Sequence, residues 1–144
     1  MDVLVTRPLP DAVIDKLGAA HDVTLRESTE PLDREEMLAA LTGFDAVLPT
    51  LGDAFSKEVF EAAGDIRCKL LANFGVGYNH IDVAAAKAHG VAVTNTPGAV
   101  TDATADIAMT LILMTARRAG EGERIVRAGD WRGWGPMQML GHHV

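Results

Sequence analysis

Five short apolar runs, separated by segments with helical patterning, constrain the fold of this chain more than any other feature. They are residues 3–5, 23–25, 46–48, 70–72 and 91–93. Parallel strands need crossover connections, and these crossovers are usually helices. Short continuous apolar runs are typical of strands that are buried on both faces. The pattern predicts an α/β fold with a doubly wound, parallel five-stranded sheet.

Local signals place the first helices between these strands. Pro10 suits the first turn of a helix whose apolar face lies within residues 13–17. Asp33 and Glu36 have the spacing of a capping box, in which each side chain accepts from a backbone donor of the other residue. The apolar residues of 37–41 then supply the buried stripe of a second helix. Both crossovers fit the predicted sheet.

The next two helices are shorter. Ser56 is expected to cap a helix that carries Val59 and Phe60. A further helix is expected over residues 83–89, and Gly90 ends it. With these elements the alternation of strand and helix continues to the fifth strand.

The pattern changes at Thr101. Residues 107–116 are apolar on every side, which predicts a helix buried on every side. We expect one helix from about residue 101 to residue 127, and turn-forming residues at 129–136. Five strands offer too little surface to bury such a helix, so it is expected to pack against additional protein and to expose an apolar patch without it.

Composition excludes several classes of partner. There are 13 Lys and Arg against 20 Asp and Glu, a net charge of −7, which disfavours nucleic acid and anionic membranes as partners. The longest apolar run is far shorter than the roughly 20 residues of a membrane helix. The N-terminal residues lack a signal-peptide pattern, which favours a cytoplasmic location. The single cysteine, Cys68, is expected to be a buried thiol.

Four loops follow the predicted strands. They are residues 6–8, 50–52, 73–77 and 95–101. Parallel topology brings such loops to one edge of the sheet, where ligands of open α/β folds bind. We therefore expect a binding site to be built from these loops.

The segment Gly75-Val76-Gly77 is the strongest candidate within that edge. Glycine admits the positive φ and the close approach that a backbone anion-binding nest requires, and a carboxylate is a plausible guest. The alternative is a simple tight turn between strand and helix. The segment lacks the third glycine of the dinucleotide-binding fingerprint.

The histidines are weaker candidates for a functional site than the glycine-containing loop. His80 has no identifiable carboxylate partner and is interpreted as a surface residue. His142 and His143 lack further ligands at zinc-site spacing, so no metal site is expected. Cys68 has no evident activating base, and no catalytic nucleophile motif is present.

The segments Asn73–Asp82 and Asn95–Arg118 closely resemble the D-isomer-specific 2-hydroxyacid dehydrogenases, particularly their glyoxylate and hydroxypyruvate reductase-like members. The similarity covers essentially all 144 residues. The resemblance implies a flavodoxin-like substrate-binding domain over residues 1–100. It implies an interdomain helix and the lead-in to a nucleotide-binding domain over residues 101–144, with the Rossmann core outside this chain.

The resemblance also implies which residues form the site. Backbone contacts to the substrate carboxylate are expected from Leu51, Gly52, Gly75, Val76 and Gly77. Contacts to the nicotinamide are expected from Val76 and Thr104. The catalytic Arg, Glu and His of the family follow a Gly-x-Gly-x-x-Gly loop, so no catalytic residue is expected in this chain.

The implied activity is hydride transfer between NAD(H) or NADP(H) and a small acid. 2-Keto acids such as glyoxylate or hydroxypyruvate are interconverted with D-2-hydroxy acids, a reaction on CH–OH donors. The chain alone is expected to be inactive, and the region 101–127 to contribute to a homodimer. The alternative is a non-catalytic binding or interaction module, corepressor-like or regulatory, on the same scaffold.

Overall fold

The computed structural model describes all residues from 1 to 144. The chain divides into two compact units, Met1–Gly98 and Ala99–Val144. The first unit holds the sheet and four helices, and the second holds two helices and a tail without regular structure.

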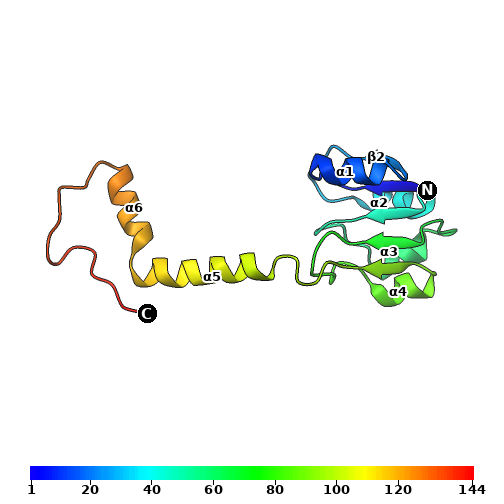
Figure 1. Ribbon diagram of the computed structural model, residues 1–144. Helices are drawn as coiled ribbons and strands as arrows, with labels where there is room; N and C mark the ends of the chain where they lie inside the picture. The colour runs from blue at the N-terminus through cyan, green and yellow to red at the C-terminus, as the bar shows by residue number, and fades with distance from the viewer. The chain divides into compact units, whose positions relative to one another are not determined.

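The first unit is built on one parallel sheet (Figure 1). Its strands are β1 (Asp2–Val5), β2 (Asp22–Leu25), β3 (Ala46–Leu48), β4 (Leu70–Ala72) and β5 (Ala92–Thr94). They pair in the order β2-β1-β3-β4-β5, and every pair is parallel. This is the flavodoxin-like order, so the predicted fold class is confirmed.

The register aligns the carboxyl ends of the strands. Val5 lies opposite Leu25 on one side and Leu48 on the other, and Ala72 lies opposite Thr94. The loops after β1, β3, β4 and β5 therefore start at the same edge. β5 begins one residue later than predicted because the N–H of Val91 donates to a carbonyl of the preceding helix, 2.9 Å away.

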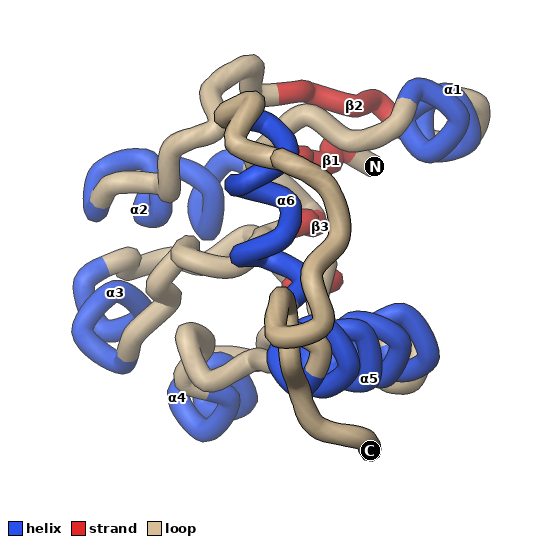
Figure 2. Tube along the Cα trace, turned by 90° about the vertical axis from the view of Figure 1, so that its left-hand side faces the viewer, coloured by secondary structure: helices blue, strands red, loops and turns tan.

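Helices cover both faces of the sheet. The helices are α1 (Asp11–Gly18), α2 (Arg34–Gly43), α3 (Lys57–Ala62) and α4 (Val83–Ala88). Figure 2 shows α2, α3 and α4 side by side on one face and α1 on the other. The doubly wound arrangement predicted from the alternating pattern is therefore present.

The core lies between the sheet and the three-helix face. α2 contributes Met37 and Leu41, and α3 contributes Val59 and Phe60, all buried. Cys68 is fully buried beneath β4, as predicted, and burial raises the pKa of its thiol. α1 has only half-buried apolar residues and no fully buried one.

The two predicted helix caps differ in outcome. Asp33 and Glu36 form the capping box: the Glu36 N–H donates to Asp33 Oδ1 at 2.8 Å, and the Asp33 N–H donates to Glu36 Oε2 at 3.0 Å. Ser56 occupies the N-cap position of α3 but does not cap the backbone. Its hydroxyl instead donates to the Glu58 carboxylate at 2.6 Å, so this part of the prediction is wrong.

In the second unit, α5 (Thr101–Ala116) and α6 (Ala119–Arg127) replace the single helix expected over residues 101–127. The break is at Arg118, whose φ of 55° is left-handed and ends α5. The Arg118 guanidinium pairs with Glu121 in the first turn of α6, at 2.8 and 2.6 Å. This ion pair spans the break, which apolar periodicity alone does not reveal.

No residue of α5 is buried in this chain. Ile107 and Leu111 are 60% and 57% exposed. The helix is therefore apolar on every side but uncovered here, as expected for this segment without additional protein. None of the helices combines the length and hydropathy that crossing a membrane requires.

Candidate functional site

The loop after β3 is a tight turn at the carboxyl edge of the sheet. The Asp53 N–H donates to the Thr50 carbonyl at 3.2 Å, which closes a four-residue β-turn. Gly52 occupies its third position with a φ of +101°. That conformation is typical of a type II turn and favours glycine strongly. Leu51 and Gly52 are both exposed.

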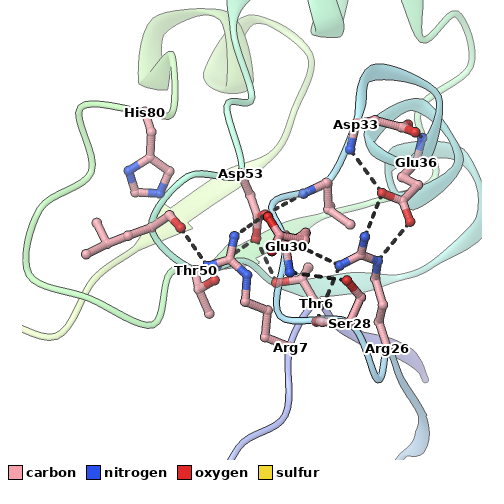
Figure 3. Close-up of polar contacts among 12 residues, drawn as sticks. Thr6, Arg7, Arg26, Ser28, Glu30, Asp33, Glu36, Thr50, Asp53 and His80 are labelled. Atoms are coloured by element: carbon pink, nitrogen blue, oxygen red, sulfur yellow. Dashed lines mark hydrogen bonds and ion pairs between the residues drawn. The ribbon is translucent and has the colours of Figure 1, made fainter.

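Arg7, at the end of β1, reaches across to this turn (Figure 3). Its Nη1 donates to the Leu51 carbonyl at 2.7 Å, and its Nη2 donates to Asp53 Oδ1 at 3.1 Å. The Arg7 side chain is only 18% exposed. One guanidinium therefore bonds both the second residue of the turn, Leu51, and its last residue, Asp53.

Asp53 anchors the guanidinium from below. Its carboxylate is fully buried and accepts hydrogen bonds from Thr6 Oγ1 at 2.7 Å and from the N–H groups of Thr50 and Leu32, each at 2.9 Å. With Arg7 it therefore has four donors, which is what a buried carboxylate needs to be tolerated. The loops after β1, β2 and β3 all meet at this side chain.

The loop after β4 is held by a second buried polar residue. Asn73 is 2% exposed, and its Nδ2 donates to the carbonyls of Gly75 at 3.1 Å and Gly77 at 2.9 Å. Its Oδ1 lies 3.1 Å from His80 Nε2. Because the amide nitrogen faces two carbonyls, the oxygen faces the imidazole, and Nε2 therefore carries a hydrogen.

His80 is partly exposed, as expected, but its ring also lies against the buried Asn73 amide, a contact that the sequence interpretation did not include. Loss of solvation lowers the pKa of the imidazole, and the charge of Asp53 opposes that shift. The neutral ring with its hydrogen on Nε2 is thus favoured. The sequence does not reveal this contact, because residue identity and spacing do not determine which side chains of a loop turn inward.

The turn Gly75-Val76-Gly77 is not a nest of positive-φ residues, because neither glycine has a left-handed φ. The Gly75 N–H donates to the Asn73 carbonyl at 2.9 Å, so it is occupied. The N–H groups of Val76 and Gly77 have no hydrogen-bond partner within the chain. The hydrogen bonds from Asn73 Nδ2 to the Gly75 and Gly77 carbonyls, rather than a left-handed glycine, hold the shape of this turn.

Several backbone donors at this edge have no hydrogen-bond partner within the chain, and four of them belong to the residues expected to bind the substrate carboxylate. These four are the N–H groups of Leu51, Gly52, Val76 and Gly77, and all four residues are exposed. The two turns are neighbours: Thr50 and Phe74 form a parallel bridge, and the Phe74 N–H donates to the Pro49 carbonyl at 2.9 Å. Clustered backbone donors of this kind suit a small anion.

The loop after β5 joins the same edge. Asn95 Nδ2 donates to the Val76 carbonyl at 2.9 Å, and the Thr96 N–H donates to the Gly75 carbonyl at 3.0 Å. Thr104, the other residue expected at the nicotinamide, lies in the second unit, and its hydroxyl donates to the Val100 carbonyl at 2.7 Å. The structure thus brings the substrate-binding candidates of the first unit together, and Thr104 belongs to the second unit.

Sequence reasoning places residues 6–8 at this edge but gives no role to Arg7, Asp53 or Asn73. The polar residues that follow β1 and β4, Arg7 and Asn73, are the available signal. Nothing in the sequence indicates that Asp53 is buried. No group of three or more His, Cys, Asp or Glu side chains is placed to hold a metal ion.

Comparison with known proteins shows what the chain is similar to. It is 39% identical over 142 residues to the glycerate dehydrogenase of Hyphomicrobium methylovorum, covering 99% of this chain and 44% of that protein. It is 40% identical over 146 residues to the glyoxylate reductase of Thermococcus onnurineus, covering 99% and 43%. The crystal structure of the TT0316 protein of Thermus thermophilus superposes with a TM-score of 0.87 at 38% identity, covering 99% and 45%.

The chain thus spans less than half the length of these relatives. Residues 3–131 match the family described as D-isomer specific 2-hydroxyacid dehydrogenase, catalytic domain. That match takes in both turns of the candidate site and both helices of the second unit. The chain therefore belongs to the D-isomer specific 2-hydroxyacid dehydrogenase family.

Proposed function

We propose that residues 1–100 form the substrate-binding domain of an NAD(P)-dependent oxidoreductase that interconverts 2-keto acids and D-2-hydroxy acids. Glyoxylate and hydroxypyruvate are the favoured substrates, since the resemblance is to reductases of these acids. The observation that carries the proposal is the set of four unpartnered N–H groups, on Leu51, Gly52, Val76 and Gly77, at the carboxyl edge of the sheet.

These donors suit the carboxylate of such a substrate. A carboxylate has two oxygens that accept several hydrogen bonds, and bonds from backbone N–H groups to a charged acceptor are roughly twice as strong as neutral ones. Gly75 contributes by having no side chain, because its own N–H is occupied. A small acid fits a site built from backbone, while the negative net charge of the chain disfavours bulk attraction of anions.

The nicotinamide cofactor, NAD(H) or NADP(H), supplies the hydride in this family. In this proposal Val76 and Thr104 contact the nicotinamide ring, and the 101–144 segment leads from the substrate domain toward the nucleotide-binding domain. We expect the phosphate-binding loop and the catalytic Arg, Glu and His outside residues 1–144. In this chain Arg7 is committed to the turn and His80 to Asn73, so neither is offered as a catalytic residue.

We also propose that the region 101–127 is a contact surface between two copies of the enzyme. Its exposed apolar side chains are expected to contribute to a homodimer of the enzyme. This assignment is separate from the carboxylate site and is tested separately below.

Two measurements on the purified chain test the proposed function together. Ligand-observed saturation-transfer NMR is expected to detect binding of D-glycerate, and glyoxylate is expected to displace it. Glycolaldehyde, which lacks the carboxylate, is the control and is expected not to compete. No competition by glyoxylate, or equal competition by glycolaldehyde, would contradict a carboxylate site.

The second measurement is turnover. With NADH or NADPH and glyoxylate or hydroxypyruvate, the purified 144 residues are expected to oxidise no cofactor above the background without protein. Robust turnover would show that the reaction does not depend on groups outside this chain. Carboxylate binding by a longer protein that contains this chain but does not turn over would instead favour the non-catalytic binding module.

A further inference from the structure

We propose that Arg7 is a positioning residue that selects one of two orientations of the Leu51–Gly52 peptide, and so aims the Gly52 N–H at the substrate carboxylate. This inference rests on the proposed function, because it concerns the same site. In this proposal Arg7 and Asp53 influence recognition of the ligand through the turn, without contacting the ligand themselves.

The orientation follows from the geometry of a trans peptide. The C=O of Leu51 and the N–H of Gly52 belong to one planar unit and point in opposite directions. The structure holds the carbonyl end with a 2.7 Å bond from Arg7 Nη1. The Gly52 N–H must then point away from Arg7, and it has no partner in the chain.

The turn type makes this bond decisive. Type I and type II turns differ mainly by a flip of their central peptide, and here that peptide is Leu51–Gly52. The φ of +101° at Gly52 corresponds to the type II form. Glycine permits both forms at little steric cost, so an outside contact has to choose between them. Arg7 supplies that contact.

Asp53 keeps the guanidinium in place. It is fully buried, and it receives the 3.1 Å bond from Arg7 Nη2 in addition to its three other donors. The planar fork of an arginine can bond Leu51 O and Asp53 Oδ1 at once, whereas a lysine ammonium lacks that fork. Figure 3 shows the Arg7 guanidinium beside the Asp53 carboxylate.

Two further observations favour a role beyond packing. An added Cβ at Gly52 would lie 3.3 Å from Arg7 Nη2, so the guanidinium packs directly against the turn. Arg7 Nε is buried without a hydrogen-bond partner. A buried unpaired donor is costly, and such costs concentrate at functional sites.

The test compares Arg7→Lys and Arg7→Met with wild type by ¹⁵N-resolved NMR of the 144-residue chain. In the ligand-free variants the Leu51 and Gly52 amide resonances are expected to shift, while those of Val76 and Gly77, held by Asn73, stay near their wild-type positions. In a glyoxylate titration, Arg7→Met is expected to raise Kd by about tenfold, the loss expected of one charge-assisted contact. Arg7→Lys keeps a positive charge near Asp53 and is expected to preserve the thermal midpoint but not the affinity.

Arg67→Met is the matched control. Arg67 pairs with Asp2 and Asp45 at the amino ends of the strands, so the variant removes the same charge and also breaks ion pairs. It is expected to bind glyoxylate as wild type does. If Arg67→Met and Arg7→Met weaken glyoxylate binding equally, the change in net charge explains the loss of affinity, and the proposal is overturned.

The remaining outcomes are equally distinct. If Arg7→Lys restores both stability and wild-type affinity, the peptide orientation does not depend on the fork, and the proposal is wrong. If Arg7→Met fails to fold, the decision rests on Arg7→Lys alone, which retains a cation beside the buried carboxylate. If wild type itself shows no saturable glyoxylate shift, the proposed function fails first, and the recognition role of Arg7 falls with it even where the ligand-free shifts appear.

Discussion

Gly52 is the residue at which backbone conformation and ligand recognition meet. Its left-handed φ fits the third position of a type II turn, and its missing side chain leaves room for Pro31 and Arg7. An added Cβ would lie 3.1 Å from Pro31 Cγ, which is tighter than ordinary packing. Both the conformation and the space therefore demand glycine.

Gly52→Ala is expected to lower the free energy of unfolding by about 1–3 kcal/mol, the usual cost of a strained backbone conformation. It is also expected to weaken glyoxylate binding, because the turn must move away from Pro31. Urea denaturation and an NMR titration measure the two effects. Gly43→Ala is the control: nothing lies within 4 Å of its added Cβ and its φ is not left-handed, so unfolding should change little. Equal effects of the two variants would contradict this account of the turn.

His80 gives the protein a stability that depends on pH. Burial lowers the pKa of its folded-state imidazole below the ordinary 6.5, so the unfolded chain binds the proton more readily. The stabilising contribution is full above pH 6.5 and is lost as pH falls from there through the lowered folded-state pKa. The urea midpoint is therefore expected to fall between about pH 7.5 and about pH 5, and His80→Gln is expected to flatten that dependence. An unchanged slope in His80→Gln would contradict it.

At this scale the sequence predicted the positions of the turns better than their chemistry. Leu51, Gly52, Val76 and Gly77 were expected at one edge, because parallel topology alone brings the loops there. Their role in binding stays a prediction. The nest geometry at Gly75 was wrong, since the turn is shaped by the buried Asn73 amide. Such contacts depend on which side chains fold inward, and residue identity does not determine that.

Helix starts are the clearest test at the scale of elements. α2 begins with a complete capping box, and Arg26 adds a bidentate pair to Glu36 at 2.8 and 3.0 Å. The backbone bond to Asp33, and then Arg26, hold the pKa of the Glu36 carboxyl below its usual range. α3 has Ser56 at its N-cap position but no side-chain cap.

Asp33→Ala is expected to cost about 1 kcal/mol of unfolding free energy, the typical value for a lost N-cap. Ser56→Ala is expected to cost clearly less, because its hydroxyl bonds Glu58 rather than the helix backbone. Urea denaturation at neutral pH measures both. A loss in Ser56→Ala as large as in Asp33→Ala would show that the hydroxyl caps α3 after all.

Elements were predictable where the signal is local. Strands and the α2 cap depend on residues within a few positions, and they were predicted to within one residue. The break between α5 and α6 was missed, because Arg118 adopts a left-handed φ that is uncommon for arginine. The i,i+3 spacing of Arg118 and Glu121, which pair across the break, is equally compatible with a continuous helix and so gave no warning of it.

For the whole molecule, the apolar surface of α5 predicts self-association. Large exposed apolar patches usually mark interfaces. Light scattering is expected to show an average mass that rises with concentration above that of one chain. Leu111→Glu is expected to suppress this rise, while Leu140→Glu, at a similarly exposed leucine in the tail, is not. A wild-type chain that stays monomeric at all concentrations would contradict the assignment of residues 101–127 as a contact surface.

We propose that this chain supplies the carboxylate-binding part of a 2-hydroxyacid dehydrogenase through backbone donors of its first unit. The most direct test is a map of amide shifts in the wild-type chain titrated with glyoxylate, with glycolaldehyde as the neutral reference. Saturable shifts are expected at Leu51, Gly52, Val76 and Gly77 with glyoxylate alone. Shifts that do not saturate, that lie elsewhere in the chain, or that glycolaldehyde reproduces would contradict it.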